Sequence, residues 1–422
     1  MKICFIADGR SPSTISWVNH FCRQGHSVSL ISSRECDPSL FRGATVLQCK
    51  WWLDKLAARI KGVAAGAGQA APWVRPTTPL GGALFRLSDS LIQPAKGIML
   101  AGWVRRVVQR IGPDVVHALR IPIEGEMAAL AGCRPLICSV WGNDFTLHYR
   151  ESPLHALLTR RLLQRMDGIM SDCHADIGRA SEAGLPPGIP RLVVPGNGGI
   201  QRGVFYKAPF NAGFCRGLGI PEDAAVILNP RGYRRYIRHD TLWRAVEIAA
   251  KKVKNLFVVG MGLKGFPDIE KEVYTRGLAG RTVLTGMLTL TQQEVAELYR
   301  RATVMVSLAE HDGTPNTLLQ ALATGCFPIC GDLPSIREWI EDGHNGRLVD
   351  VNNPEGVAAA IVDAVRDGGL RERAATINER IIAERADYEQ YMPKAELFCH
   401  EVIERSRSGA VSCAKPNFRL LD

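Results

Sequence analysis

The residues best suited to chemistry form a polar loop that leads into a predicted helix, Thr317 to Thr324. Asp312 and Gln320 lie eight positions apart across the helix start, whose free N–H groups and positive dipole end favour a phosphate. Gly313 lets the backbone approach a ligand closely. We therefore expect a phosphate or nucleotide cradle here, and the alternative is a capped helix without a ligand. The other polar residues of this loop, of which the last two could cap the helix, are Thr314, Asn316 and Thr317.

A cluster of arginines follows a predicted strand, Ala225–Asn229, and could supply cations for such an anion. Arginine suits this role because its guanidinium binds phosphate oxygens with two hydrogen bonds and stays charged. The alternative is a solvated run of charge. The arginines are Arg231, Arg234, Arg235 and Arg238.

Two polar positions in the first half of the chain also follow or end predicted strands. Asp144, in the segment from Trp141 to Asp144, could act as an acid, a base or a hydroxyl binder, or it could cap a helix. His117 ends the strand Asp114–Ala118 and is expected at the same rim, or it is a structural histidine.

Alternating strands and helices must position these residues. This alternation predicts an α/β fold class with two doubly wound parallel sheets, whose boundary falls between residues 205 and 221. Ligands of such sheets bind beyond the carboxyl ends of the strands, so the cleft between two facing units is the expected site. The remaining expected strands are Lys2–Ala7, Ser27–Ser32, Leu136–Val140, Gly168–Ser171, Leu192–Val194, Leu256–Gly260, Thr282–Thr285, Thr303–Leu308, Phe327–Cys330 and Arg347–Val349. The expected helices include Thr14–Arg23, Thr241–Lys251, Gln292–Arg301 and Pro354–Arg366.

The composition is that of an ordinary globular protein, with 422 residues, 46% hydrophobic and 22% charged. Its length favours two domains, and it has no run of eighteen apolar residues that would predict a membrane span. The first residues read as a strand rather than a signal peptide. Twelve cysteines occur without Cys-x-x-Cys pairs, which predicts buried thiols in a reducing, cytoplasmic compartment and no metal site.

The net charge of +10 is concentrated in the first half, where residues 1–200 hold 23 Lys and Arg against 14 Asp and Glu. This excess indicates an anionic partner, such as a membrane surface, a phosphorylated acceptor or nucleic acid. Trp51 and Trp52 stand among lysines on an amphipathic stretch, which suits a bilayer interface or, equally, a helix that covers the sheet.

The segment from Asp312 to Gly325 resembles the motif of the retaining, nucleotide-sugar-dependent glycosyltransferases of the GT-B fold, in particular family 4. The turn from Gly331 to Glu338 and the segment from Asp342 to Gly346 are similar to that family as well. Tyr388 to Ile403 resembles its closing helix, which crosses back to the first domain. The resemblance implies an acceptor-binding Rossmann-like domain at residues 1–205, a nucleotide-sugar-binding one at 206–385, and a returning helix and tail at 386–422.

By this resemblance Asp312 contacts the donor sugar, and Gln320 contacts the ribose where the family has a glutamate. The diphosphate would be bound by Arg231 with Arg235 or Arg238. Trp141 stands where many members have a histidine. The implied catalytic residues are Asp312, Asp144 and Arg231, and the implied acceptor side includes Trp141 and His117. The implied donor-binding residues are Arg235, Arg238, Gly313, Thr314, Asn316, Thr317 and Gln320.

The resemblance implies a metal-independent transferase without a cofactor. It would move a sugar with retention from a nucleotide diphosphate sugar to an acceptor hydroxyl of a glycan or lipid-linked acceptor. Bacterial surface polysaccharide, lipopolysaccharide or glycolipid synthesis is the expected setting, in the cytoplasm or peripherally on the inner face of the membrane. Nucleic acid is not an expected partner. The alternatives are a nucleotide-sugar 2-epimerase of the same fold and a non-catalytic sugar-nucleotide-binding subunit.

Overall fold

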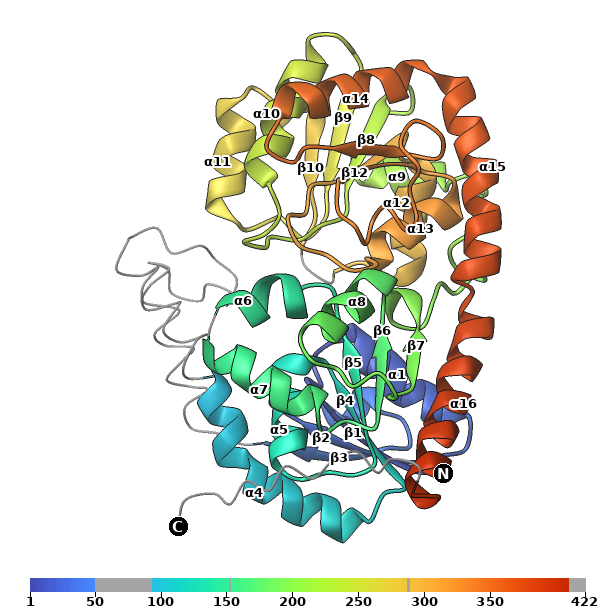
Figure 1. Ribbon diagram of the computed structural model, residues 1–422. Coiled ribbons are helices and arrows are strands. Elements are labelled where there is room, and N and C mark those ends of the chain that lie inside the picture. The colour runs from blue at the N-terminus through green and yellow to red at the C-terminus, as the bar shows by residue number, and fades with distance from the viewer. Residues whose placement is uncertain (50–92, 152, 287–288, 410–422) are drawn as a thin grey trace.

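The computed structural model describes residues 1–49, 93–151, 153–286 and 289–409 (Figure 1). Two parallel sheets, one in each half of the chain, form its frame. The first sheet has the strand order β3-β2-β1-β4-β5-β6-β7 and the second the order β10-β9-β8-β11-β12-β13. The strands of the first sheet are β1 Lys2–Ala7, β2 Ser27–Ser32, β3 Thr45–Gln48, β4 Val115–Leu119, β5 Leu136–Val140, β6 Gly168–Ser171 and β7 Arg191–Val193. Those of the second are β8 Ala225–Asn229, β9 Leu256–Gly260, β10 Thr282–Leu284, β11 Val304–Ser307, β12 Phe327–Gly331 and β13 Arg347–Val349.

Helices cover both faces of each sheet, so both faces of the central strands are apolar. In β1, Cys4 and Ile6 face one core while Ile3 and Phe5 face the other, as the twofold alternation of a strand requires. The first sheet is covered by α1 Pro12–Arg23, α4 Gln93–Ile111, α5 Glu126–Leu130, α7 Pro153–Leu163 and α8 His174–Glu182. The second is covered by α9 Ala212–Gly217, α10 His239–Ala250, α11 Pro267–Thr275, α12 Gln292–Arg301, α13 Asn316–Thr324 and α14 Pro354–Arg366.

The last two helices run from the second sheet back to the first along one side of the molecule (Figure 1). They are α15 Gly368–Arg385 and α16 Tyr388–Arg407. The apolar face of α16 lies in the core of the first unit, and its end is held there by an Arg407–Asp114 ion pair of 2.9 Å. The C-terminal helix therefore belongs to the core of the first unit although it follows the second in sequence.

Most predicted elements are present, and several have the predicted bounds. The sequence analysis did not predict β3, which is an edge strand with partly exposed side chains, or α15, which is largely polar. The predicted domain limits after residues 205 and 385 fall between β7 and α9 and at the end of α15. Among the described residues no helix is long and apolar enough to cross a membrane. The predicted interfacial stretch around Trp51 and Trp52 lies outside the described residues.

Candidate functional site

The loop from Asp312 to α13 lies at the carboxyl end of β11, as predicted, but its helix begins one residue earlier, at Asn316. The N-cap residue is Pro315, whose backbone is extended and which has no side chain able to cap. The prediction that Asn316 or Thr317 caps the helix is therefore wrong, because both lie inside its first turn. The N–H groups at this helix start consequently donate no hydrogen bond to an N-cap side chain.

Arg231 and Asp312 meet at the centre of this loop. Arg231 follows β8 and Asp312 follows β11, and these strands are neighbours in the second sheet. Arg231 Nη1 lies 2.7 Å from Asp312 Oδ2 and 3.3 Å from Thr317 Oγ1. Burial alone would lower the pKa of Arg231, but the carboxylate of Asp312 raises it, so this cation stays charged at the helix start.

Arg235 and Arg238, the other two arginines expected at the diphosphate, have different surroundings. Arg238 contacts acidic side chains, with Asp240 at 2.9 Å and Glu310 at 3.2 Å, and it donates to Asn352 as well. Arg235 lies close enough to His311 to influence it electrostatically. Burial lowers the pKa of His311, and the charges of Arg150 and Arg235 lower it further against the opposing effect of Glu310. Arg238 is thus paired with acidic side chains, whereas Arg235 lies near His311.

The remaining predicted donor-binding residues, in the loop and in α13, have different surroundings. The side chain of Thr314 is buried and accepts a hydrogen bond of 3.0 Å from Trp339 Nε1. Asn316 Oδ1 is buried against Gly196 of the first unit, where an added Cβ would lie 2.5 Å from it. Gln320 is partly exposed one turn into α13. The loop therefore contacts its own unit through Thr314 and the other unit through Asn316.

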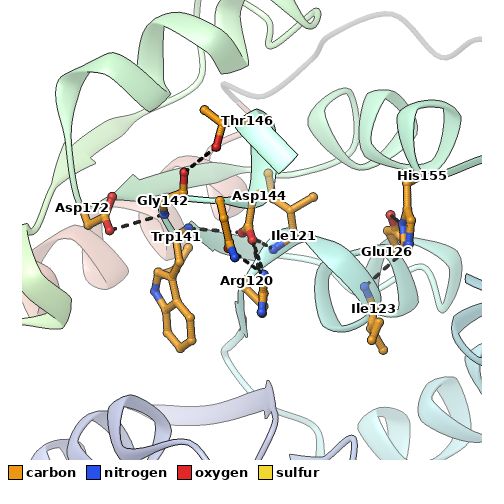
Figure 2. Close-up of polar contacts among 12 residues, drawn as sticks. Arg120, Ile121, Ile123, Glu126, Trp141, Gly142, Asp144, Thr146, His155 and Asp172 are labelled. Carbon is orange, nitrogen blue, oxygen red and sulfur yellow. Dashed lines mark hydrogen bonds and ion pairs between the residues drawn. The ribbon is translucent and has the colours of Figure 1, made fainter. Parts of the chain in front are cut away.

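Asp144 is fully buried and is held by the loops of the first unit (Figure 2). Its Oδ1 accepts hydrogen bonds from Arg120 Nη2 at 2.7 Å and Nε at 3.2 Å. Its Oδ2 accepts from the N–H groups of Ile121 at 3.1 Å and Trp141 at 3.2 Å. Both oxygens thus hold backbone and side chain in place, which is the geometry of an anchor for the loop that begins at Trp141.

The sequence analysis expected His117 at the rim of the sheet, and this prediction is wrong. β4 continues two residues past it to Leu119, and its side chain is completely buried. The ring packs against Phe5 and Trp17, and Nε2 lies 2.8 Å from Ser139 Oγ. Burial lowers the pKa of His117 to about 3, so the ring is neutral in the core.

The two units touch where the Trp141 loop meets the Asp312 loop. A Cβ added to Gly142 would lie 2.0 Å from Gly313 N, so only glycine permits this approach. A Cβ added to Gly313 would lie 2.3 Å from Asp172 Oδ1. The seam between the units therefore runs through the predicted site.

The sequence analysis missed Asp172, which directly follows β6 at this seam. It is buried, and its Oδ2 accepts a long hydrogen bond of 3.5 Å from Gly142 N (Figure 2). Among the residues that the structure describes, Oδ1 has no hydrogen-bond partner. Burial raises the pKa of Asp172, and the nearby carboxylates of Asp176 and Asp312 raise it further. The available signal was its place at the carboxyl end of a strand.

By residue type, Asp172, Cys173 and Asp176 could hold a metal ion, since their ligand atoms lie within 4.8 Å of one another. The electrostatics oppose a cation at this position. The group lies at the start of α8, whose dipole end is positive, and Arg179 already pairs with Asp176 at 2.6 Å. Burial also raises the pKa of the Cys173 thiol far above its usual range, which disfavours the thiolate that a metal requires.

Comparison with known proteins gives two family matches that together span most of the chain. The family described as Glycosyl transferases group 1 matches residues 226–367, and the family described as Glycosyl transferase 4-like domain matches residues 11–198. The first of these matches spans the strands of the second sheet, and the other spans β2 to β7 of the first sheet.

Similar proteins include N-acetyl-alpha-D-glucosaminyl L-malate synthase of Bacillus anthracis, 23% identical over 75% of this chain and 82% of that protein. D-inositol 3-phosphate glycosyltransferase of a Nocardioides species is 28% identical over 42% of each chain.

Solved structures share the fold at low identity. Sucrose-phosphate synthase of Thermosynechococcus elongatus has a TM-score of 0.71 at 12% identity and covers 96% of this chain and 100% of its own. Anabaena HepE, solved with UDP and glucose, has a TM-score of 0.68 at 14% identity, with 97% and 100% covered.

Proposed function

The chain belongs to the glycosyl transferases group 1 family and is a glycosyltransferase of the GT-B fold, and on this premise we propose the reaction that its site performs. It transfers a sugar from a nucleotide diphosphate sugar to an acceptor hydroxyl, with retention of the anomeric configuration. The observation that carries the proposal is the Arg231–Asp312 pair at the start of α13, on the seam between the units.

The leaving group is a nucleoside diphosphate, whose negative charge grows as the bond from the anomeric carbon to the phosphate oxygen breaks. Arg231, Arg235 and the N–H groups at the start of α13 stabilise that charge in a partly buried site, where such electrostatic contributions are large. These groups serve without a bound metal. Arg238 supports the loop from outside, because its guanidinium is paired with Asp240 and Glu310.

Asp312 accepts hydrogen bonds from hydroxyls of the donor sugar, and Arg231 holds its carboxylate in position. Gln320 contacts the ribose, since an amide can both accept and donate. The Trp141 loop of the first unit faces the donor sugar from the other side. Asp144 acts through that loop by holding it in place, rather than by touching substrate, because both its oxygens are already hydrogen-bonded.

The acceptor binds to the first unit, whose excess of positive charge supports an anionic or lipid-linked glycan. The names of two relatives contain L-malate and D-inositol 3-phosphate, which are anionic, and another relative acts in lipopolysaccharide core biosynthesis. We place the reaction in bacterial surface glycan or glycolipid synthesis, in the cytoplasm, with association at the anionic inner face of the membrane.

The test is a screen of UDP-, GDP- and ADP-linked hexoses by thermal shift, since a ligand at a hundred times its dissociation constant adds about 2.7 kcal/mol of stability. Hits are then incubated with glycolipid acceptors, and the product is analysed by mass spectrometry and by NMR for its anomeric configuration. Transfer that survives in Asp312→Ala would overturn the site assignment. Conversion of the donor sugar to its epimer without an acceptor would indicate an epimerase, and binding without any turnover would indicate a non-catalytic subunit.

A further inference from the structure

A carboxylate of the second unit binds the start of a helix in the first. Glu338 lies in the turn after β12, and α8 directly follows β6 at the seam (Figure 1). Glu338 Oε2 accepts a hydrogen bond of 3.0 Å from the N–H of His174, and Oε1 accepts one of 2.8 Å from the N–H of Ala175. The two units are thus joined by a charge-assisted pair of hydrogen bonds.

The helix start of α8 is suited to such a partner. Its N-cap residue is Cys173, which has no side-chain oxygen that could accept hydrogen bonds from the first N–H groups of the helix. The positive dipole end of the helix also favours a negative charge. The carboxylate of Glu338 therefore does for α8 what an N-cap aspartate would do, but it does so from the other unit.

The turn that carries Glu338 also holds the Asp312 loop. Ser335 Oγ donates a hydrogen bond of 2.7 Å to the carbonyl oxygen of Asp312, and Trp339 Nε1 donates one of 3.0 Å to Thr314 Oγ1. Both Ser335 and Trp339 are buried. The position of Glu338 is therefore coupled to the backbone of Asp312 and to the side chain of Thr314.

The end of α15 fixes this turn from behind. Arg385 Nη2 donates a hydrogen bond of 2.8 Å to the carbonyl oxygen of Glu338, and its guanidinium lies 4.7 Å from the centre of the Trp339 ring. The turn is thus supported on one side by α15 and on the other by the Asp312 loop. This leaves the side chain of Glu338 directed across the seam to α8.

We propose that Glu338 is a positioning residue of the transfer reaction, which holds the two units closed over the donor by binding the start of α8. The inference rests on the proposed function for its catalytic consequence. Closure brings the Asp312 loop against the Trp141 loop and excludes water, and loss of the contact lets the units separate. Donor is then lost to hydrolysis in place of transfer.

The first experiment compares Glu338→Ala and Glu338→Gln with wild type and with Glu341→Gln. Glu341 is a matched control, because it lies three residues away with a side chain that is 79% exposed. We expect Glu338→Ala to lower kcat for transfer about tenfold, to raise the ratio of donor hydrolysis to transfer, and to enlarge the radius of gyration in small-angle X-ray scattering. Glu338→Gln keeps one acceptor oxygen and should lie between, while Glu341→Gln should match wild type.

The second experiment removes the contact from the α8 side. His174→Pro deletes one of the two N–H groups at the first position of the helix, where proline is tolerated, and Cys173 before it already has the extended backbone that proline requires. His174→Ala is its control, because the exposed ring is removed while the N–H stays. We expect His174→Pro to reproduce the effects of Glu338→Ala, and the double variant to be no worse than Glu338→Ala alone.

The outcomes separate the positioning role from the proposed reaction. If wild type transfers sugar and Glu338→Ala has unchanged scattering, hydrolysis ratio and kcat, the positioning role is wrong. If wild type transfers no sugar, the proposed function fails, while the scattering of Glu338→Ala and His174→Pro still decides whether this contact holds the units together.

Discussion

Arg231 Nη1 lies 2.7 Å from Asp312 Oδ2, although the two residues are 81 positions apart and follow different strands. The pair is only 12% and 17% exposed, and Arg231 also contacts Thr317 at the start of α13. A cation, a carboxylate and the start of a helix thus share one point on the seam between the units. The cation and the helix start can bind a diphosphate, and the carboxylate can accept a hydrogen bond from a sugar hydroxyl.

Asp312→Ala should lower transfer about a hundredfold or more, because it removes a contact to the donor sugar and releases Arg231 from its position. Steady-state transfer assays check this. Asp332→Ala is the control, since that exposed carboxylate of the second unit pairs only with Arg337 among the described residues. An Asp312→Ala variant within threefold of wild type would remove Asp312 from the site.

Gly142→Ala should abolish close approach of the units, because the new Cβ would lie 2.0 Å from the backbone nitrogen of Gly313. We expect at least a tenfold loss of transfer and a larger radius of gyration, with each unit still folded by circular dichroism. Gly178→Ala in α8 is the matched control, since a Cβ there meets nothing within 4 Å. Full activity of Gly142→Ala would show that this contact is not part of the active conformation.

Gln320→Ala should weaken binding of the nucleoside diphosphate about tenfold, which corresponds to the loss of roughly 1.4 kcal/mol of hydrogen bonding to the ribose. Gln320→Glu should bind at least as tightly as wild type. Isothermal titration calorimetry measures both dissociation constants. Equal affinities for all three proteins would place the ribose away from α13.

Asp144→Ala should destabilise the protein by about 3 kcal/mol, because it leaves Arg120 and two N–H groups without their buried partner. Asp144→Asn should cost less, since the amide oxygen still accepts hydrogen bonds. Urea unfolding measures both. If Asp144→Ala unfolds like wild type but loses transfer, Asp144 acts directly on the substrate rather than through the Trp141 loop.

Stability should depend on pH through Glu124. Burial, together with the charge of Asp8, raises the pKa of this carboxyl from 4.5 to about 7 against the opposing effects of Ser33 and Arg120. Between these values the folded protein holds a proton that the unfolded chain has released, so stability falls as pH rises through this window and then levels off.

The full effect of Glu124 is of order 3 kcal/mol. Urea unfolding at pH 5 and pH 8 should therefore show a smaller loss of stability for Glu124→Gln than for wild type. Glu341→Gln, which changes an exposed carboxylate, should keep the loss of wild type. A loss that Glu124→Gln leaves unchanged would mean that the carboxyl is ionised in the folded protein.

The strands and several helices could be predicted because their signals are local. Continuous apolar runs bounded by Gly, Pro or polar residues gave β5, β6, β8 and β9 with their observed ends. The edge strand β3 and the polar helix α15 were missed, since neither buries a distinct apolar face. The position of the Asp312 loop at the carboxyl end of a strand also followed from sequence alone, because it depends only on the order of elements.

The partner of each charge was decided only by the tertiary structure. Asp144 pairs with Arg120, and Arg238 pairs with Asp240 and Glu310. His117 lies inside β4, which ends at Leu119, one residue later than predicted. Glu338 meets Ala175 across 163 positions of sequence. Strand and helix patterns depend on neighbours a few residues away, whereas these contacts depend on how two separately folded units pack against each other.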